Sequence, residues 1–160
     1  MKAMRNGFSL IELLIVVTII LILAAIAIPN LLQSKMAANQ ASAVASCRGI
    51  TSSEVTYIAI YNQGYASSLA AMGPPAASAS PSASAADLLD VSLAAGAKSG
   101  YDYVYAPGSA DPQGHYESFT LNANPVSHGV TGNDYYFTDQ TFVIRFNTAS
   151  KASAASTPLG

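Results

Sequence analysis

The 160-residue chain has very little charge, which excludes several kinds of partner at the outset. Charged residues make up 10% of it and the formal net charge is −2. Such a chain offers no broad basic surface that could neutralise a row of phosphate groups. We therefore expect no nucleic-acid partner.

Cysteine and histidine are also scarce. A single cysteine, Cys47, excludes an intramolecular disulfide and any metal site built from several thiolates. The two histidines, His115 and His128, lie in connections that contain Gly and Pro, without the spacing to Cys or carboxylates that a metal or catalytic site needs. No nucleophile-elbow, P-loop or H-E-x-x-H motif occurs. The sequence predicts no enzyme activity, no cofactor and no metal.

One long apolar run stands out against this background. Phe8 to Ile28 holds 21 residues with one charge, and as a helix it would measure roughly 31 Å, about the thickness of the hydrocarbon layer of a bilayer. Lys2 and Arg5 precede the run, with no acidic residue before it. The positive-inside rule then keeps the N-terminus in the cytoplasm and sends everything after Pro29 outward.

The charge inside the run is Glu12, and a carboxylate in apolar surroundings needs a partner. The run itself contains no Lys, Arg or His. A cut just before Phe8 would create an α-amino group one turn away, and the amine of the same chain or of a neighbouring copy could pair with Glu12. Pairing between copies would set their axial register while the apolar faces pack.

Two simpler interpretations of the run stay open at this point. Ala25-Ile26-Ala27 fits an A-x-A cleavage site, so the run could be a secretory signal peptide. A plain membrane anchor would explain the length and orientation of the run, but it would not explain the charged residue Glu12 within it.

The run Gly7-Phe8-Ser9-Leu10-Ile11-Glu12-Leu13, with the apolar stretch that ends at Ala27-Ile28-Pro29, resembles the prepilin N-terminus of type IV pilins and secretion-system pseudopilins. The resemblance implies that a prepilin peptidase cuts between Gly7 and Phe8 and N-methylates Phe8. Residues 1–7 would be the leader, and a subunit of 153 residues (160 minus 7) would remain. Glu12 would be the assembly residue, meeting the Phe8 amine of an adjacent subunit.

The same resemblance implies a structural subunit of a type IV pilus, used for adhesion, twitching motility or DNA uptake. The partners would be further copies of the chain in a helical filament, the prepilin peptidase and a pilus assembly platform in the inner membrane. The chain would sit there as a single-pass prepilin and then become part of an extracellular pilus. The alternative within the family is a pseudopilin of a type II secretion system. A third possibility is an anchored binding domain that does not polymerise.

Beyond the run, an apolar stripe at helical spacing predicts that the helix continues past Pro29, which should kink it. We expect a membrane-spanning or filament-core half over 8–30 and an amphipathic half over 31–62. The stripe comprises Met36, Val44, Cys47, Ile50, Tyr57, Ile58 and Tyr61. Cys47 on this stripe is interpreted as a small buried apolar residue.

Residues 63–100 are rich in Ala, Ser, Gly and Pro, and they predict loops with one short helix over 88–95 that starts at a capping-box-like Ser84-Ala85-Ala86-Asp87. We interpret the stretch 73–86 as a flexible surface loop rather than a glycosylated segment.

Residues 101–147 alternate with period two and predict an antiparallel sheet. Tyr101, Tyr103 and Tyr105 should share one strand face, and Phe119 and Leu121 should share another. A hairpin with its loop at Thr138–Thr141 should turn Phe142, Ile144 and Phe146 inward. The acidic and amide residues of the turns could bind calcium, but a turn role is favoured for each: Asp111, Asn133, Asp134 and Asp139.

With a loose tail over 148–160, the predicted class is α+β: a long N-terminal helix whose second half packs on a small antiparallel sheet. The resemblance adds the ladle shape of pilins.

Overall fold

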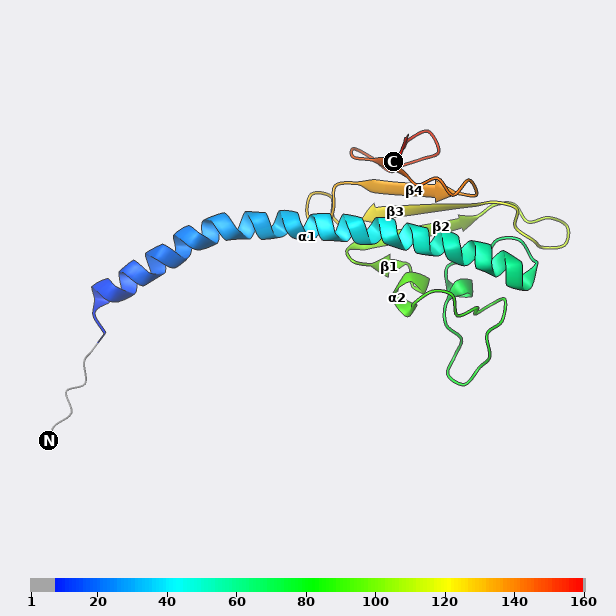
Figure 1. The fold of residues 1–160 in the computed structure, drawn as a ribbon, viewed down its shortest axis with the longest axis horizontal. Coiled ribbons are helices and arrows are strands. Elements are labelled where there is room, and N and C mark those ends of the chain that lie inside the picture. Colours follow the sequence, from blue (N-terminus) through cyan, green and yellow to red (C-terminus); the bar gives the residue numbers. More distant parts are fainter. Residues whose placement is uncertain (1–7, 160) are drawn as a thin grey trace. The chain divides into compact units, whose positions relative to one another are not determined.

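The computed structural model describes residues 8–159, and Figure 1 shows their elements in order along the chain. Helix α1 runs from Leu10 to Tyr61 without interruption. The chain divides into two compact units, Met1–Lys35 and Met36–Gly160, so the two halves of α1 belong to different units. In its described part the first unit is a helix preceded by Phe8 and Ser9.

The second unit is built on a six-stranded sheet in which each strand pairs with its neighbours in the sequence, all antiparallel. The strands are β1 Ala97–Lys98, β2 Tyr101–Pro107, β3 Phe119–Pro125, β4 Tyr135–Asp139, β5 Arg145–Asn147 and β6 Thr157–Pro158. The longest pairing joins β2 to β3, from Tyr101 opposite Pro125 to Pro107 opposite Phe119. Such a meander joins each strand directly to its neighbour, without a crossover.

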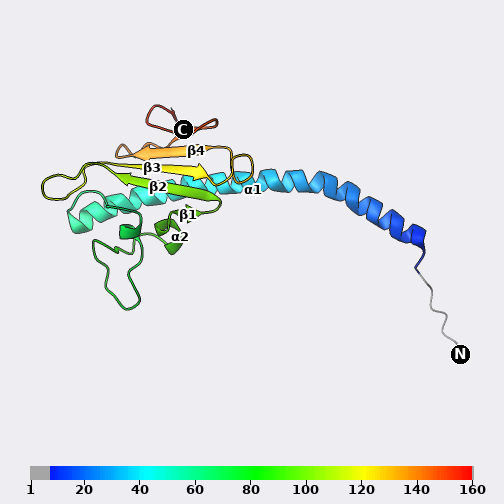
Figure 2. The ribbon, with the colours of Figure 1, turned by 180° about the vertical axis from the view of Figure 1, so that it is seen from behind.

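The core lies between this sheet and the second half of α1, which Figures 1 and 2 show along the sheet. The helix buries a stripe of side chains, namely Ala43, Ser46, Cys47, Ile50, Ser53, Glu54 and Tyr57. On the sheet, Tyr101, Tyr103, Phe119 and Leu121 are buried and Tyr105 packs against them. The predicted α+β class and the alternation on β2 and β3 are confirmed.

The predicted helix over 88–95 is much shorter in the structure. Helix α2 spans only Val91–Ala94, and a 3-10 turn, η1, spans Ala70–Met72. Asp90, not the Ser84 segment, caps α2: its carboxylate accepts from the N–H groups of Ser92 (3.0 Å) and Leu93 (3.1 Å). Leu88 and Leu89 donate their N–H groups to the Met72 carbonyl, so they link two segments instead of extending the helix.

The predicted hairpin also differs in its turn. Strand β4 continues to Asp139, whose side chain accepts from the Thr141 N–H at 2.9 Å while its carbonyl accepts from the Phe142 N–H at 2.9 Å. Phe142 has a φ of +58° and is 41% exposed, so its predicted inward position is wrong. Ile144 is buried as predicted. The turn therefore uses residues 139–142 rather than 138–141, because Asp139 favours this local hydrogen bonding.

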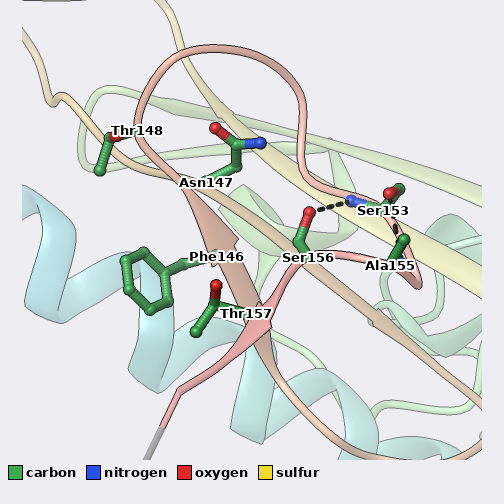
Figure 3. Close-up of a pocket in the computed structure, with 7 residues that line it drawn as sticks. All are labelled: Phe146, Asn147, Thr148, Ser153, Ala155, Ser156 and Thr157. Carbon is green, nitrogen blue, oxygen red and sulfur yellow. Dashed lines mark hydrogen bonds between the residues drawn. The ribbon is translucent and has the colours of Figure 1, made fainter.

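The tail over 148–160 was predicted to be loose, and its described residues 148–159 are instead attached to the sheet. Ala152 is buried and its carbonyl accepts from Asn122 Nδ2 at 2.9 Å. β6 pairs with β5, and the Leu159 N–H donates to the Ile144 carbonyl at 2.8 Å. Figure 3 shows the loop between them curling over a shallow pocket, with Ser156 Oγ accepting from the Ser153 N–H. The sheet thus spans 97–158 rather than 101–147.

Gly64 and Gly114 can be used to test how closely the turn after α1 packs against the 108–118 connection. Both have positive φ, +74° at Gly64 and +87° at Gly114, but a Cβ on Gly64 would strike the Tyr116 carbonyl oxygen, whereas a Cβ on Gly114 meets nothing within 4 Å. Gly114→Ala should cost only the left-handed backbone penalty, about 1–2 kcal/mol. Gly64→Ala should lower the free energy of unfolding clearly further, as measured by urea denaturation of the full chain in one detergent. Equal losses in the two variants would contradict this packing.

Candidate functional site

The first turn of α1 holds Glu12 through a hydrogen bond to its own backbone. Helix α1 begins at Leu10, so Ser9 is the N-cap residue and Glu12 stands at the third helical position. Glu12 Oε2 accepts from the Ser9 N–H at 2.9 Å. This is the backbone half of a capping box, S-x-x-E, and it places a carboxylate at the positive end of the helix dipole.

The cap is a feature that the sequence argument for Glu12 missed. The apolar run contains no cation, so an amine freed by processing was the predicted partner of Glu12. The Ser9-to-Glu12 spacing was readable as a capping box. Since a carboxylate accepts hydrogen bonds at both oxygens, the cap on Oε2 is compatible with a pair at Oε1. The assembly role of Glu12 and Phe8 stays a prediction. Gly7, the other predicted processing residue, lies outside the described residues.

The rest of the site is a continuous apolar surface on the first half of α1. Phe8 is 78% exposed, and the large apolar side chains between Leu10 and Leu32 are 45% to 82% exposed. Among the described residues, α1 is the one helix long and apolar enough to cross a membrane, and none of its most apolar stretch is buried. So much apolar surface requires a bilayer or other protein chains to cover it.

Three polar side chains of this half donate hydrogen bonds within the helix. Each donates to the carbonyl four residues earlier: Thr18 to Leu14 at 2.7 Å, Asn30 to Ile26 at 3.1 Å and Ser34 to Asn30 at 2.9 Å. A helix with its polar groups paired internally is suited to surroundings without water.

Pro29 lies inside α1, as expected, and the helix continues on both sides of it. Proline has no N–H to give to the carbonyl of Ala25. The next residue, Asn30, adds a side-chain donor to the Ile26 carbonyl and so reinforces the helix beside the gap. The kink at Pro29 stays a prediction.

Comparisons with known proteins bear on these same residues. A model of the prokaryotic N-terminal methylation motif matches residues 2–28. The N-terminal segment of the chain therefore carries the prokaryotic N-terminal methylation motif. Over 71 residues it is 46% identical to the type IV wide pilus major component PilA4 of Thermus thermophilus, an alignment covering 43% of this chain and 53% of that protein. The chain thus spans about half the length of this curated relative, and no solved structure matches it. The predicted resemblance is confirmed.

Beyond the methylation motif, the second half of α1 buries an acid that the sequence pattern did not single out. Glu54 is fully buried, and its Oε2 accepts from the Ala66 N–H at 3.0 Å. Its Oε1 is buried with no hydrogen-bond partner among the described residues. Burial raises the pKa of Glu54 above its ordinary value of 4.5, and the bond from Ala66 offsets only part of the effect. Glu54 lies four residues after Ile50 and three before Tyr57, so its position on the apolar stripe could have been noticed.

Cys47 is fully buried on the same helix face, and burial raises the pKa of its thiol to about 12. A thiol that stays protonated is a poor nucleophile and a poor metal ligand. The interpretation of Cys47 as a small core residue is confirmed by its burial.

Of the residues predicted as possible calcium or histidine sites, Asp139 ends β4 and the others lie in turns and connections. Asp111 accepts from the N–H groups of Gln113 (2.9 Å) and His115 (2.7 Å), and its other oxygen lies 3.5 Å from His115 Nδ1. Asp139 caps its own turn, and the His128 ring stacks on Tyr135. The Asp134 carbonyl accepts from the Tyr101 hydroxyl at 2.9 Å. Asp111 and Asp139 thus use their carboxylates for local backbone bonds.

The buried acid predicts that the stability of this chain depends on pH. Because folding raises the pKa of Glu54, the folded state holds the Glu54 proton more tightly than the unfolded state. The proton therefore contributes its full stabilisation below pH 4.5, and this stabilisation is lost as the pH rises through the pKa of the folded state. Glu54→Gln keeps an acceptor for Ala66 and removes the titration. In this variant the free energy of unfolding should fall less between acidic and neutral pH than it does in the native chain.

The measurement is denaturant unfolding of the full chain across that pH range. Glu117→Gln, at an exposed position, is the matched control and should leave the pH dependence of the native chain unchanged. A pH profile of Glu54→Gln that overlays the native one would show that Glu54 is not the group responsible.

Proposed function

We propose that this protein is a structural subunit of a type IV pilus that polymerises through the first half of α1. The observation that carries the proposal is the exposed apolar surface between Leu10 and Leu32, in whose first turn the Glu12 carboxylate caps the helix. The methylation motif over residues 2–28 and the similarity to a pilus component support it. The role is structural and needs no catalytic step.

Processing prepares the chain for assembly in this proposal. A prepilin peptidase cuts between Gly7 and Phe8, and the new amine on Phe8 is N-methylated. The cap survives the cut, because the Ser9 N–H that binds Glu12 belongs to the mature chain. The cut adds a cation next to a carboxylate that is already oriented by its own helix.

Assembly then pairs the Glu12 carboxylate of one copy with the Phe8 amine of the next. In an apolar environment such a pair is strong, and a lone charge there is costly, so subunits in the wrong axial register are disfavoured. The apolar side chains around it supply the packing between helices. The charge pair therefore sets the register, and the apolar surface supplies the cohesion.

The location follows from the same helix. Before assembly the chain sits in the inner membrane as a single-pass protein, N-terminus inside because of Lys2 and Arg5 and C-terminus outside. The assembly platform in that membrane moves it into an extracellular filament used for adhesion, twitching motility or DNA uptake.

The processing step predicts a specific N-terminus. Protein isolated from its native host should begin at Phe8, carry an N-methyl group and contain 153 residues (160 minus 7). N-terminal sequencing with intact-mass measurement checks this. An N-terminus at Met1, or one after Ala27, would overturn the proposed processing.

Variants of Glu12 separate the cap from the charge pair. Glu12→Gln keeps an oxygen that can accept from the Ser9 N–H but removes the charge, whereas Glu12→Ala removes both. If the pair between copies drives assembly, both variants should abolish surface filaments seen by electron microscopy of intact cells.

Immunoblotting of membranes should show both variants present, cleaved and unpolymerised. Thr18→Val, which removes a helix-internal hydrogen bond in the same apolar half, is the control and should assemble normally. Normal filaments from Glu12→Gln would show that Glu12 acts as a cap alone.

A further inference from the structure

An open groove of about 320 Å³ lies at the C-terminal end of α1, within the second unit. Four segments line it: the end of α1, the turn that follows, the Ala/Ser/Pro loop and the 108–118 connection. Its walls include three tyrosines and three neutral polar residues: Tyr57, Tyr65, Tyr116, Gln63, Ser67 and Ser84. The volume falls within the range of about 300–1,000 Å³ typical of small-molecule sites.

Hydrogen bonds join the four segments around the groove in two pairs. The Tyr65 N–H donates to the Tyr116 carbonyl at 2.8 Å, a close approach that only the glycine at position 64 permits. The Tyr57 hydroxyl donates to the Ala83 carbonyl at 2.6 Å. Behind the groove, the Tyr65 ring packs on Phe119 with the ring centroids 4.9 Å apart. The side chains of Tyr57 and Tyr65 and the backbone of Tyr116 are therefore held in place before any ligand arrives.

The chemistry of the lining selects for an uncharged ligand. Within residues 8–159, no Asp, Glu, Lys, Arg or His lines the groove. The neighbouring Asp111 uses its carboxylate for two backbone N–H groups, and Glu54 lies buried with an oxygen bonded to Ala66. Tyrosine rings offer flat apolar surfaces, while phenol, serine and glutamine groups donate and accept hydrogen bonds. A ligand that matches has apolar C–H faces and several hydroxyl groups.

We propose that the groove formed by Tyr57, Tyr65 and Tyr116 binds an uncharged pyranose sugar. One face of the sugar ring stacks on a tyrosine, and its hydroxyls bond to Gln63, Ser67 and Ser84. The C-terminal pocket of Figure 3 is less suited, since it offers one aromatic ring, Phe146, where the groove offers three tyrosines. The site belongs to the second unit and does not depend on polymerisation.

The test is a titration of the full-length chain in detergent micelles with methyl glucoside, methyl galactoside and N-acetylglucosamine, followed by amide NMR shifts. At least one sugar should shift the amides of Gly64, Tyr65 and Tyr116 saturably in the millimolar range. Gly129, in another loop with a similar φ of +79°, is the internal reference and should not move.

Variants assign the effect to the aromatic surface. Tyr116→Leu should weaken sugar binding about tenfold or more, while Tyr116→Phe keeps the ring and most of the affinity. Tyr135→Leu, at a half-buried tyrosine stacked on His128, is the control and should bind like the native chain. The proposal is overturned if no sugar shifts these amides, if Tyr116→Leu binds as well as the native chain, or if tetramethylammonium binds there and the sugars do not.

Discussion

The exposed apolar surface of the first half of α1 is the constraint on which everything else in this molecule depends. Side chains from Leu10 to Leu32 present roughly half or more of their area outward, and the hydrophobic effect makes that arrangement untenable in water. The surface can persist only in a bilayer or against other chains. A helix whose Thr and Asn side chains bond to its own carbonyls is equally suited to both surroundings.

Glu12 has a role in both surroundings, the bilayer and the contact with other chains. Its bond to the Ser9 N–H satisfies one oxygen within the chain, which lowers the cost of placing a carboxylate in an apolar helix. The second oxygen is the acceptor that the proposed partner amine would use. A carboxylate oriented in advance by its own helix end can serve first as a cap and then as half of an ion pair, without rearrangement of the helix.

The second unit folds with few charged residues and without a disulfide. Its sheet joins strands that are neighbours in the sequence, so each pairing closes over a single connection. Tyrosines fill the space between α1 and the sheet, and their hydroxyls bond to backbone carbonyls such as those of Ala66, Ala83 and Asp134. The bonds to Ala66 and Ala83 attach Ala- and Ser-rich segments, which have little apolar surface of their own, to the core.

The sequence by itself determined the elements whose pattern is local and strong: the long apolar helix, its continuation past Pro29, and the alternating faces of β2 and β3. Periodicity carries this information because burial selects one face of each element. The tertiary structure alone decided the rest. The tail is attached because Ala152 meets Asn122 and β6 meets β5, and α2 is short because Leu88 and Leu89 bond to Met72. The burial of Glu54 likewise depends on Ala66 and the sheet packed over it. Each outcome rests on a partner remote in sequence, which no local pattern encodes.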